Sequence, residues 1–416
     1  MNKKIIKCTL ILLLAVFFCH FLGAVPSGER LRVLADRIGV LVGYASRSNF
    51  NTMSDAAQYM EVARTEFNFL TAENAMKMDA LQPSQGTFNF GPADQHVQFA
   101  QSNGMQMHGH TLVWHSQAPS WIQGISDRNQ LISAMYTHID TVLSHYQGQI
   151  LVWDVVNEAF NEDGSYRTSF WYNVIGQSYL DLAFQRARQA DPNAKLIYND
   201  YNLAEIGSKS NGAYNMIQSM VNRGIPIDGV GFQMHLTDGG INYTSFADNM
   251  ARFAALGLEI YVTELDVRIP ENPSQSDLLN QANIYRQVVE TCLAQPACKA
   301  IQVWGIPDKY SWVPSVFPGT GAPLLFDDNY NAKSCYYEVQ TVLADTSPQQ
   351  DNLGDVNNDN TVNIVDALMI AQYYVGLNPP GFNAANGDVN CDGSINIVDA
   401  LMVAQSYVGL IGSFAC

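Results

Sequence analysis

The sequence predicts an α/β protein in which a (β/α)8 TIM barrel precedes a small helical module. The chain has 416 residues, which is long for one core and suits a large domain with a smaller one. Between residues 27 and 344, strand-like apolar runs alternate with segments of helical spacing, and after residue 353 a tandem repeat replaces them. We therefore expect a barrel over 28–345, a linker over 346–353 and a C-terminal module over 354–416.

Residues 1–24 have the features of a secretory signal peptide. Three lysines surround an apolar run over residues 5–18, and the small residues Gly23 and Ala24 follow it. The run is short for a membrane anchor, and a lipoprotein signal at Cys19 would have two bulky phenylalanines before it. We expect cleavage near Ala24, a secreted, extracellular protein and no membrane span after cleavage.

Eight apolar, β-branched runs are strand candidates of a buried parallel sheet. They cover residues 40–45, 67–73, 106–114, 150–157, 195–200, 229–235, 259–264 and 299–304. Segments between them, such as 54–64, 129–145 and 178–189, show helical spacing. Eight such repeats predict a closed barrel with its active site at the carboxyl ends of the strands.

Two of these strands bring a glutamate to that rim. Glu158 directly follows one strand, and Glu264 ends another. A single strand-end glutamate is more often a cap or an ion-pair partner, whereas two on one sheet suggest a catalytic pair. Such a pair cleaves glycosidic bonds: one carboxyl group protonates the leaving oxygen, and the other stabilises or attacks the sugar carbon.

Amide and aromatic residues gather at the same strand ends. Amides bind sugar hydroxyls, and flat indole rings stack on the apolar faces of pyranose rings. One His or Trp there is usually core packing, but packing does not require such groups to converge from several strands. The net charge of −17, from 22 basic and 39 acidic residues, argues against nucleic acid as a partner.

Five motifs resemble those of the family 10 glycoside hydrolases, the endo-β-1,4-xylanases. They are His-Thr-Leu-Val-Trp-His at 110–115, Trp-Asp-Val-Val-Asn-Glu-Ala at 153–159, Gln-Met-His at 233–235, Val-Thr-Glu-Leu-Asp at 262–266 and Trp-Gly-Ile-Pro-Asp-Lys-Tyr-Ser-Trp at 304–312. The resemblance spans essentially residues 28–345. It implies that Glu158 is the general acid/base and Glu264 the nucleophile of a retaining reaction, which needs no cofactor.

The resemblance also implies the substrate-binding residues. Asn157 would bind the 2-hydroxyl of the sugar being cleaved. Gln233 would position the acid/base and His235 the nucleophile, with Asp266 behind His235. The remaining substrate-binding residues would be Glu73, Asn74, Lys77, His110, Trp114, Tyr201, Trp304 and Trp312. Met78 departs from a common version of the pattern, in which a tryptophan follows the lysine.

Five cysteines remain after the predicted cleavage, in an oxidising compartment. The Cys292–Cys298 pair resembles a disulfide found in some relatives. Pairing the nearest cysteines of the C-terminal module predicts a second bridge, Cys391–Cys416, and leaves Cys335 as a free, buried thiol.

The C-terminal module contains two loops with the ligand spacing of EF-hand-like calcium sites. Each places oxygen donors at loop positions 1, 3, 5, 7, 9 and 12. The first set is Asp355, Asn357, Asp359, Thr361, Asn363 and Asp366, and the second is Asp388, Asn390, Asp392, Ser394, Asn396 and Asp399. One such loop could be an ordinary Asn/Asp-rich turn, but two in register predict two bound Ca²⁺ ions.

Each loop leads into one apolar helix, an arrangement that resembles a type I dockerin. The resemblance implies docking to a cohesin domain of a scaffold or cell surface, as in a cellulosome. Its recognition positions would be Ile364 and Val365 in one repeat and Ile397 and Val398 in the other. Identical pairs fit binding in either of two orientations; the alternative is that they serve only the module's core.

These predictions describe a monomeric, secreted endo-1,4-β-xylanase that binds xylan and is anchored through its dockerin. Two alternatives remain open: another β-1,4-glycanase that cleaves cellulose or mixed-linkage glucan, and a non-catalytic polysaccharide-binding protein on the same barrel. The presence of both Glu158 and Glu264 argues against the non-catalytic protein. Against the glucanase, the resemblance implies a central subsite too tight for the hydroxymethyl group of glucose.

Overall fold

The computed structural model describes residues 28–346, 353–359, 361–412 and 414. The predicted signal peptide and residues 347–352 of the predicted linker lie outside the described residues. Within the described ranges, no helix combines the length and the hydropathy that crossing a membrane requires.

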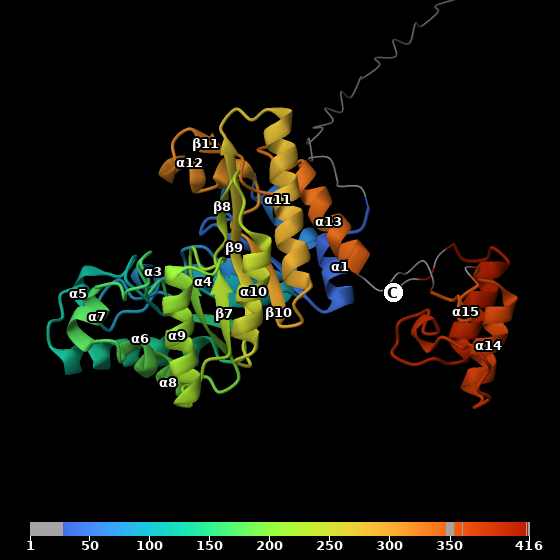
Figure 1. Cartoon of the computed structure of the whole chain (residues 1–416), viewed down its shortest axis with the longest axis horizontal. Coiled ribbons are helices and arrows are strands. Elements are labelled where there is room, and N and C mark those ends of the chain that lie inside the picture. Colours follow the sequence, from blue (N-terminus) through green and yellow to red (C-terminus); the bar gives the residue numbers. More distant parts are fainter. Residues whose placement is uncertain (1–27, 347–352, 360, 413, 415–416) are drawn as a thin grey trace, which may run out of the picture.

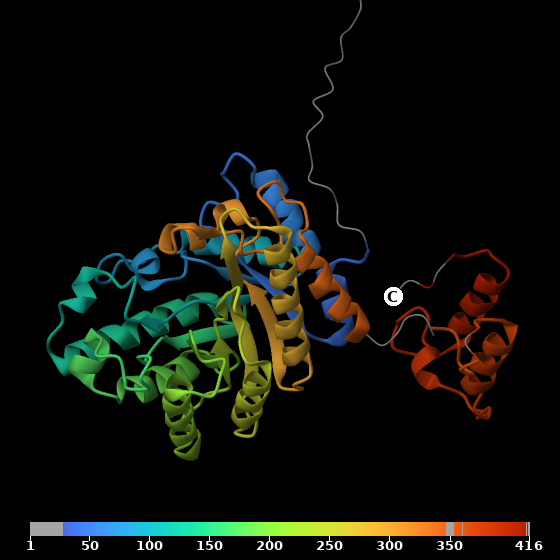
Figure 2. The same cartoon turned by 45° about the horizontal axis from the view of Figure 1, so that its top comes forward.

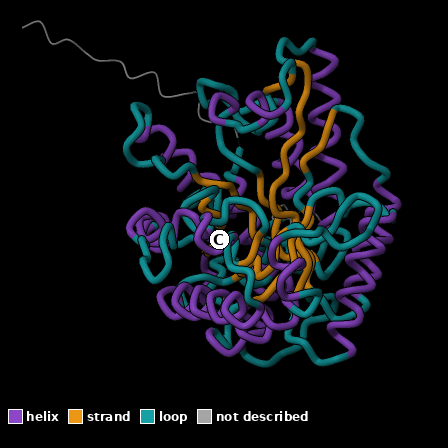
Figure 3. Tube along the Cα trace, turned by 90° about the vertical axis from the view of Figure 1, so that its left-hand side faces the viewer, coloured by secondary structure: helices purple, strands orange, loops and turns teal. Residues whose placement is uncertain are grey.

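The described residues form a closed barrel of eight parallel strands, as the sequence predicts (Figures 1 and 3). Around the barrel the strands are β1 (Leu41–Ser46), β2 (Phe69–Ala72), β3 (Gln106–Gly109), β5 (Val152–Asn157), β6 (Lys195–Asp200), β7 (Gly229–Phe232), β9 (Glu259–Pro270) and β10 (Cys298–Val303). Strand β10 pairs with both β9 and β1, which closes the sheet. The carboxyl ends of all eight strands therefore meet at one rim.

Helices surround the strands (Figure 3). The longer ones are α1 (Leu31–Ile38), α2 (Ala56–Glu66), α4 (Gly91–Ser102), α6 (Arg128–Tyr146), α8 (Tyr179–Ala190), α9 (Ser208–Asn222), α10 (Tyr243–Ala254), α11 (Gln275–Leu293) and α13 (Ser334–Thr346). Short helices in the loops are α3 (Met78–Leu81), α5 (Ser120–Gln123), α7 (Phe170–Ile175), η1 (Asp308–Tyr310) and α12 (Val313–Val316). Side-chain caps start several of them: Asp127 caps α6, and Ser274 forms a capping box at α11.

Two predicted strands are each interrupted. The run 106–114 is β3 and then β4 (Val113–Trp114), because His110 turns to bond Asp154 and the Leu112 amide donates to the Asp154 carbonyl. The run 229–235 is β7 and then β8 (His235–Thr237), because Met234 between them has a left-handed φ of 63°. Strand β9 is longer than predicted, since it also pairs with β8 and β11 (Thr320–Gly321).

The barrel interior is packed toward the amino ends of the strands. Phe69, Val152, Ile197, Tyr261 and Ala300 come from five strands and form one buried cluster there. A larger core fills the space between the strands and the helices. The barrel interior is therefore filled by apolar side chains at this level.

The C-terminal module is helical, as predicted, and has its own core (Figures 1 and 2). Helix α14 (Ile364–Tyr374), the short η3 (Ala384–Asn386) and α15 (Ile397–Tyr407) are its described helices. The α14 and α15 helices pack on each other, and their core consists of Ala367, Ile370, Ala400 and Val403 from the helices with Val356 and Val389 from the preceding loops. Each helix starts with an Asn–Asp capping box that joins it to the preceding loop.

The structure contains the predicted Cys292–Cys298 disulfide, which links the end of α11 to the start of β10. Cys335 is a free, buried cysteine, and burial raises the pKa of its thiol to about 11. Cys416 lies outside the described residues, so the Cys391–Cys416 bridge stays a prediction.

Candidate active site

Glu158 and Glu264 line the same cleft at the carboxyl rim of the barrel, which has a volume of about 570 Å³. All eleven residues predicted to bind substrate line this cleft as well: Glu73, Asn74, Lys77, His110, Trp114, Asn157, Tyr201, Gln233, His235, Trp304 and Trp312. The structure thus brings together residues from seven of the eight strands or the loops that follow them. The cleft is also lined by Gln117, Asn202, Arg268 and Phe317, to which no sequence motif assigned a role.

Glu264 is buried and accepts hydrogen bonds at both carboxylate oxygens. The Asn199 amide donates to Oε1 over 2.8 Å, and His235 Nε2 lies 3.1 Å from Oε2. Burial alone raises the pKa of Glu264, but the hydrogen bond from His235 and the charges of His110 and His235 outweigh it, so the pKa is lowered. Glu264 is therefore ionised at neutral pH.

His235 lies between two carboxylates. Its Nδ1 is 2.9 Å from Asp266 Oδ2, which also accepts a 2.8 Å hydrogen bond from the Trp312 indole. Burial lowers the pKa of His235, but the charges and hydrogen bonds of Asp266 and Glu264 raise it, for a net value of about 10. The ring is therefore protonated at neutral pH and donates to both carboxylates.

Glu158 has a different environment. Its carboxylate accepts hydrogen bonds from the Trp114 indole at 3.0 Å, the Gln233 amide at 3.1 Å and the Asn157 amide at 3.3 Å, all of which are neutral donors. The side chain is 13% exposed, against 6% for Glu264, so Glu158 has more access to the open cleft. Gln233 and His235 thus contact the two glutamates that the sequence analysis paired them with.

The backbone at Glu158 is left-handed, with a φ of 57°. Three hydrogen bonds hold it: Glu158 N donates to the Asn199 carbonyl, Arg167 Nε donates to the Glu158 carbonyl over 3.0 Å, and Ala159 N donates to the Tyr198 hydroxyl over 2.9 Å. These contacts fix the direction in which the Glu158 side chain leaves the strand.

The buried side chain of Asp200 positions Tyr198, which contacts the backbone beside Glu158. The Tyr198 hydroxyl donates to Asp200 Oδ2 over 2.5 Å, and Lys209 Nζ lies 3.0 Å from Asp200 Oδ1. Burial raises the pKa of Asp200 to about 7, against the lowering effects of Lys209 and Tyr198. Lys209 Nζ also lies over the Tyr201 ring, 3.2 Å from its centroid, and Arg167 donates a hydrogen bond to the Tyr201 hydroxyl. Lys209 and Arg167 therefore also position Tyr201, which lines the cleft.

Lys77, Asn74 and Gln117 form a polar cluster in the cleft, beside Glu73. Lys77 Nζ donates to Asn74 Oδ1 over 2.9 Å and to Gln117 Oε1 over 2.6 Å, and it lies 5.0 Å from the centroid of a Trp114 ring. Burial lowers the pKa of Lys77 and raises that of Glu73. Met78, at the start of α3, is buried in the core and is not among the residues that line the cleft.

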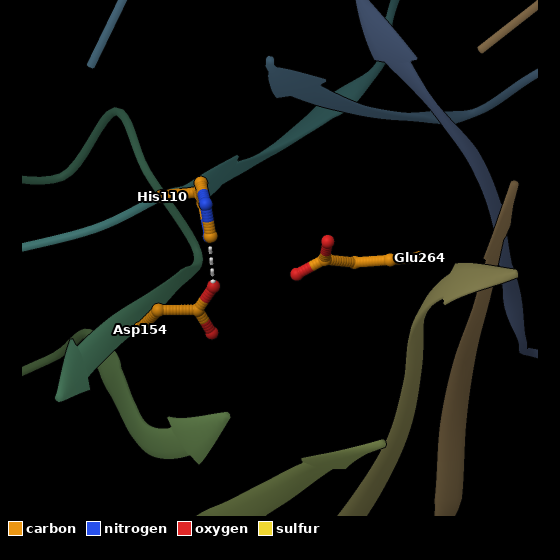
Figure 4. A group of neighbouring side chains, drawn as sticks. All are labelled: His110, Asp154 and Glu264. Atoms are coloured by element: carbon orange, nitrogen blue, oxygen red, sulfur yellow. Dashed lines mark hydrogen bonds and ion pairs between the residues drawn. The ribbon is translucent and has the colours of Figure 1, made fainter. Parts of the chain in front are cut away.

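Figure 4 shows His110, Asp154 and Glu264, whose ligand atoms all lie within 4.8 Å of one another. The carboxylate oxygens of this group are already hydrogen-bonded. Asp154 is bonded by His108 at Oδ1 and by His110 at Oδ2, and Glu264 is bonded by Asn199 and His235. These bonds orient His110, and we assign the group to the polar floor of the cleft.

In both C-terminal loops, backbone amides donate to the predicted oxygen ligands. In the second loop, Asp388 accepts from Asp392 N and Gly393 N, Asn390 accepts from Asp392 N, and Asp399 accepts from Val389 N and Asn396 N. The first loop repeats the equivalent bonds to Asp355, Asn357 and Asp366. These bonds curl each loop around its oxygen donors, and an all-oxygen donor set fits Ca²⁺.

Two family models match separate parts of the chain. A family model described as Glycosyl hydrolase family 10 matches residues 30–342, and one described as Dockerin type I domain matches residues 353–406. Endo-1,4-beta-xylanase B of Thermotoga neapolitana is 50% identical over 315 residues, which cover 75% of this chain and 91% of that protein. Endo-1,4-beta-xylanase of Agaricus bisporus is 42% identical over 321 residues, covering 76% and 96%.

Solved structures give the same result. The crystal structure of native xylanase 10B from Thermotoga maritima has 52% sequence identity and a TM-score of 0.75, covering 76% of this chain and 98% of its own. That of xylanase 10B from Thermotoga petrophila RKU-1, in complex with xylobiose, has 51% identity and a TM-score of 0.75, covering 77% and 98%.

Proposed function

The chain belongs to glycosyl hydrolase family 10 and carries a type I dockerin, and from this premise we propose a secreted, retaining endo-1,4-β-xylanase that acts through Glu158 and Glu264. The observation that carries the proposal is that both carboxyl groups line one cleft in unlike surroundings. Glu264 is ionised and held by charged and amide donors, whereas every hydrogen-bond donor to Glu158 is neutral. Unlike environments for two carboxyl groups are what separate a nucleophile from an acid.

In the first step, the Glu264 carboxylate attacks the anomeric carbon of a xylose unit while the bond to the leaving oxygen breaks. Glu158 gives its proton to that oxygen, which leaves as a shortened xylan chain. The product on the enzyme is a covalent xylosyl ester of Glu264. His235 keeps Glu264 oriented and ionised before the attack, and Gln233 keeps Glu158 directed at the leaving oxygen.

In the second step, Glu158 is a carboxylate and removes a proton from water. The water oxygen attacks the anomeric carbon, the ester bond to Glu264 breaks, and the β-configuration is restored. Asn157 binds the 2-hydroxyl of the xylose being cleaved. Glu73, Asn74 and Lys77 hold the next sugar on the non-reducing side, and Tyr201 stacks on the leaving side.

A second candidate function is cleavage of cellulose or mixed-linkage glucan in the same cleft. The named relatives are endo-1,4-beta-xylanases, and the Thermotoga petrophila structure holds xylobiose, which favours xylan. A reducing-sugar assay on xylan, carboxymethylcellulose and mannan, run side by side, tests this. We expect release from xylan alone, with Glu264→Ala as the inactive control; equal release from cellulose would contradict the substrate assignment.

The C-terminal module supplies attachment. We infer that Asp355, Asn357, Asp359, Thr361, Asn363 and Asp366 hold one Ca²⁺ and that Asp388, Asn390, Asp392, Ser394, Asn396 and Asp399 hold the other. Ile364 and Val365 are 51% and 48% exposed, and Ile397 and Val398 are 52% and 46% exposed, which supports two equivalent cohesin-binding faces. We therefore propose a cohesin as the partner of this module and an extracellular location at a cellulosome or cell surface. We also propose that the enzyme acts as a monomer.

A further inference from the structure

Arg268 differs from every other lysine and arginine of the described residues. Each of the others donates a hydrogen bond or forms an ion pair. Arg268 does neither within the part of the chain that the structure describes; its recorded contact is with the ring of Phe317, at 4.0 Å from guanidinium carbon to centroid. This guanidinium therefore keeps all five N–H donors available.

Arg268 lines the same cleft as Glu158 and Glu264. It is partly exposed, and Phe317 under it packs edge-on against Trp312, with ring centroids 5.5 Å apart. Stacking on an aromatic face holds a guanidinium flat and leaves its edge free to bind. The donors of Arg268 are thus placed by its contact with Phe317 before any ligand arrives.

The position of Arg268 is at the rim of the cleft. It is four residues beyond Glu264 on the same strand, β9, which corresponds to about 13 Å of extended chain. Its partner across the ladder is Thr237 of β8, which is exposed. A xylan main chain bound at Glu264 would lie below Arg268, whereas a branch that points out of the cleft would pass close to it.

The main chain of xylan is uncharged, so binding it does not require an unpaired cation such as Arg268. A partly buried guanidinium loses hydration, and this loss is offset when an anion takes the place of water. The cleft's other cations already have partners: Lys77 bonds Asn74 and Gln117, and His235 bonds Asp266 and Glu264. The planar edge of a guanidinium matches the two oxygens of a carboxylate, which it binds with two parallel hydrogen bonds.

We propose that Arg268 binds the carboxylate of a uronic acid branch on the xylan chain, so that the enzyme prefers acidic, branched xylan to neutral xylan. The inference rests on the proposed xylanase function and adds the class of substituent that the cleft recognises. No bond changes at Arg268: it binds the branch while Glu158 and Glu264 cleave the main chain.

The test compares two polymers that differ only at the uronic carboxyl group: a glucuronoxylan, and the same polymer after these groups have been reduced to alcohols. For the wild-type enzyme we expect a higher kcat/KM on the acidic polymer. The measured quantity is the ratio of kcat/KM on the acidic polymer to kcat/KM on the reduced polymer. Arg268→Met, which keeps an apolar stem over Phe317, should lower this ratio about tenfold, as expected for the loss of a charge-assisted hydrogen bond. Molar salt should narrow the wild-type preference.

Two variants serve as controls. Arg268→Lys keeps the charge and loses the planar edge, so its ratio should fall between those of the wild type and Arg268→Met. Arg252→Met removes another guanidinium that lies over a ring, at Tyr214 outside the cleft, and should leave the ratio as in the wild type. An unchanged ratio in both active Arg268 variants would overturn the role of Arg268 alone. A wild-type enzyme that cleaves neither polymer would overturn the xylanase function as well.

Discussion

The backbone of Glu158 is the point where single residues matter most. A left-handed φ at a non-glycine residue costs free energy on the order of 1 kcal/mol or more and persists only where neighbours hold it. Here the neighbours are Arg167, Tyr198 and the Asn199 carbonyl, and none of them has to touch the substrate for this purpose. They act by fixing where the proton of Glu158 is delivered.

Arg167→Met should therefore impair proton delivery more than binding. We expect kcat/KM on xylan to fall about 10- to 100-fold, because the leaving sugar needs a well-placed acid. The loss on 2,4-dinitrophenyl xylobioside should be much smaller, because that leaving group departs without a proton. Steady-state kinetics on both substrates gives the comparison. A fall in kcat for xylan indicates poorer proton delivery, whereas a rise in KM alone would indicate weaker binding at Tyr201, whose hydroxyl Arg167 also bonds.

Arg188→Met is the matched control for this experiment. Arg188 also donates to backbone carbonyls, those of Pro192 and Ala194, but it lies before β6, at the amino ends of the strands. Arg188→Met should change kcat/KM by no more than a small factor on either xylan or 2,4-dinitrophenyl xylobioside. Equal losses on the two substrates in Arg167→Met would mean that Arg167 supports the fold without directing the acid.

His235 links the site to pH. Its folded-state pKa of about 10 lies above the value of about 6.5 for an unfolded histidine. Because the folded pKa is the higher one, protonation of His235 stabilises the folded barrel. This contribution to the free energy of unfolding is complete below about pH 6.5 and is lost progressively as the pH rises to about 10. The melting temperature of the barrel should fall over this range, and His235→Asn should show a shallower fall. Calorimetry from pH 6 to pH 10.5 measures both, and parallel curves would refute the role of His235.

The sequence predicted the residues that follow strand ends and missed those that reach the cleft by other routes. Strand-end motifs marked Glu158, Glu264 and the residues paired with them. Arg268 lies on the extension of β9, and Phe317 lies in the loop after α12, where no periodic pattern marks a site. Their role depends on a ring and a guanidinium that meet only in the fold.

At the scale of elements, hydrophobic periodicity predicted the strands but not their interruptions. The breaks between β3 and β4 and between β7 and β8 depend on contacts with other strands, such as that of His110 with Asp154. Both breaks lie at the rim, beside the cleft. The side-chain pattern of an isolated strand carries no information about such partners.

We expect the folding of the two proposed calcium loops to depend on bound cations. Residues 354–416 contain no lysine or arginine, and their six acidic side chains are all proposed calcium ligands. Without a cation, three carboxylates in each loop repel one another, and the module's small core offers little to oppose this repulsion. Calcium should therefore be required for the module to fold.

Calorimetry of the full chain tests this requirement. We expect two transitions with Ca²⁺ present; a chelator should shift the module's transition far down or remove it, and added Ca²⁺ should restore it. The barrel's transition and its xylanase activity should not change, because no proposed catalytic group binds a metal. A module transition that is the same with and without chelator would show that the loops are not calcium sites.

At the scale of the whole molecule, the two repeats predict redundant attachment. If the Ile364–Val365 and Ile397–Val398 faces are equivalent, loss of one leaves the other able to bind. Ile364→Asp or Ile397→Asp alone should then weaken binding to a cohesin only about twofold, the factor for losing one of two equal modes. The double variant should lose binding. Calorimetric titration of the three variants measures this, and a complete loss from either single change would rule out equivalent faces.

The division of labour between Glu158 and Glu264 is the central claim, and azide rescue of Glu158→Ala tests it most directly. With an activated aryl xyloside, this variant should still form the xylosyl ester on Glu264, because the leaving group needs no proton. Azide then replaces the missing base-activated water, so turnover should increase and the product should be the β-xylosyl azide, identified by NMR. Glu264→Ala should not turn over this substrate under the same conditions without azide. An α-xylosyl azide from Glu158→Ala would contradict the account, because it would mean that Glu158 is the nucleophile.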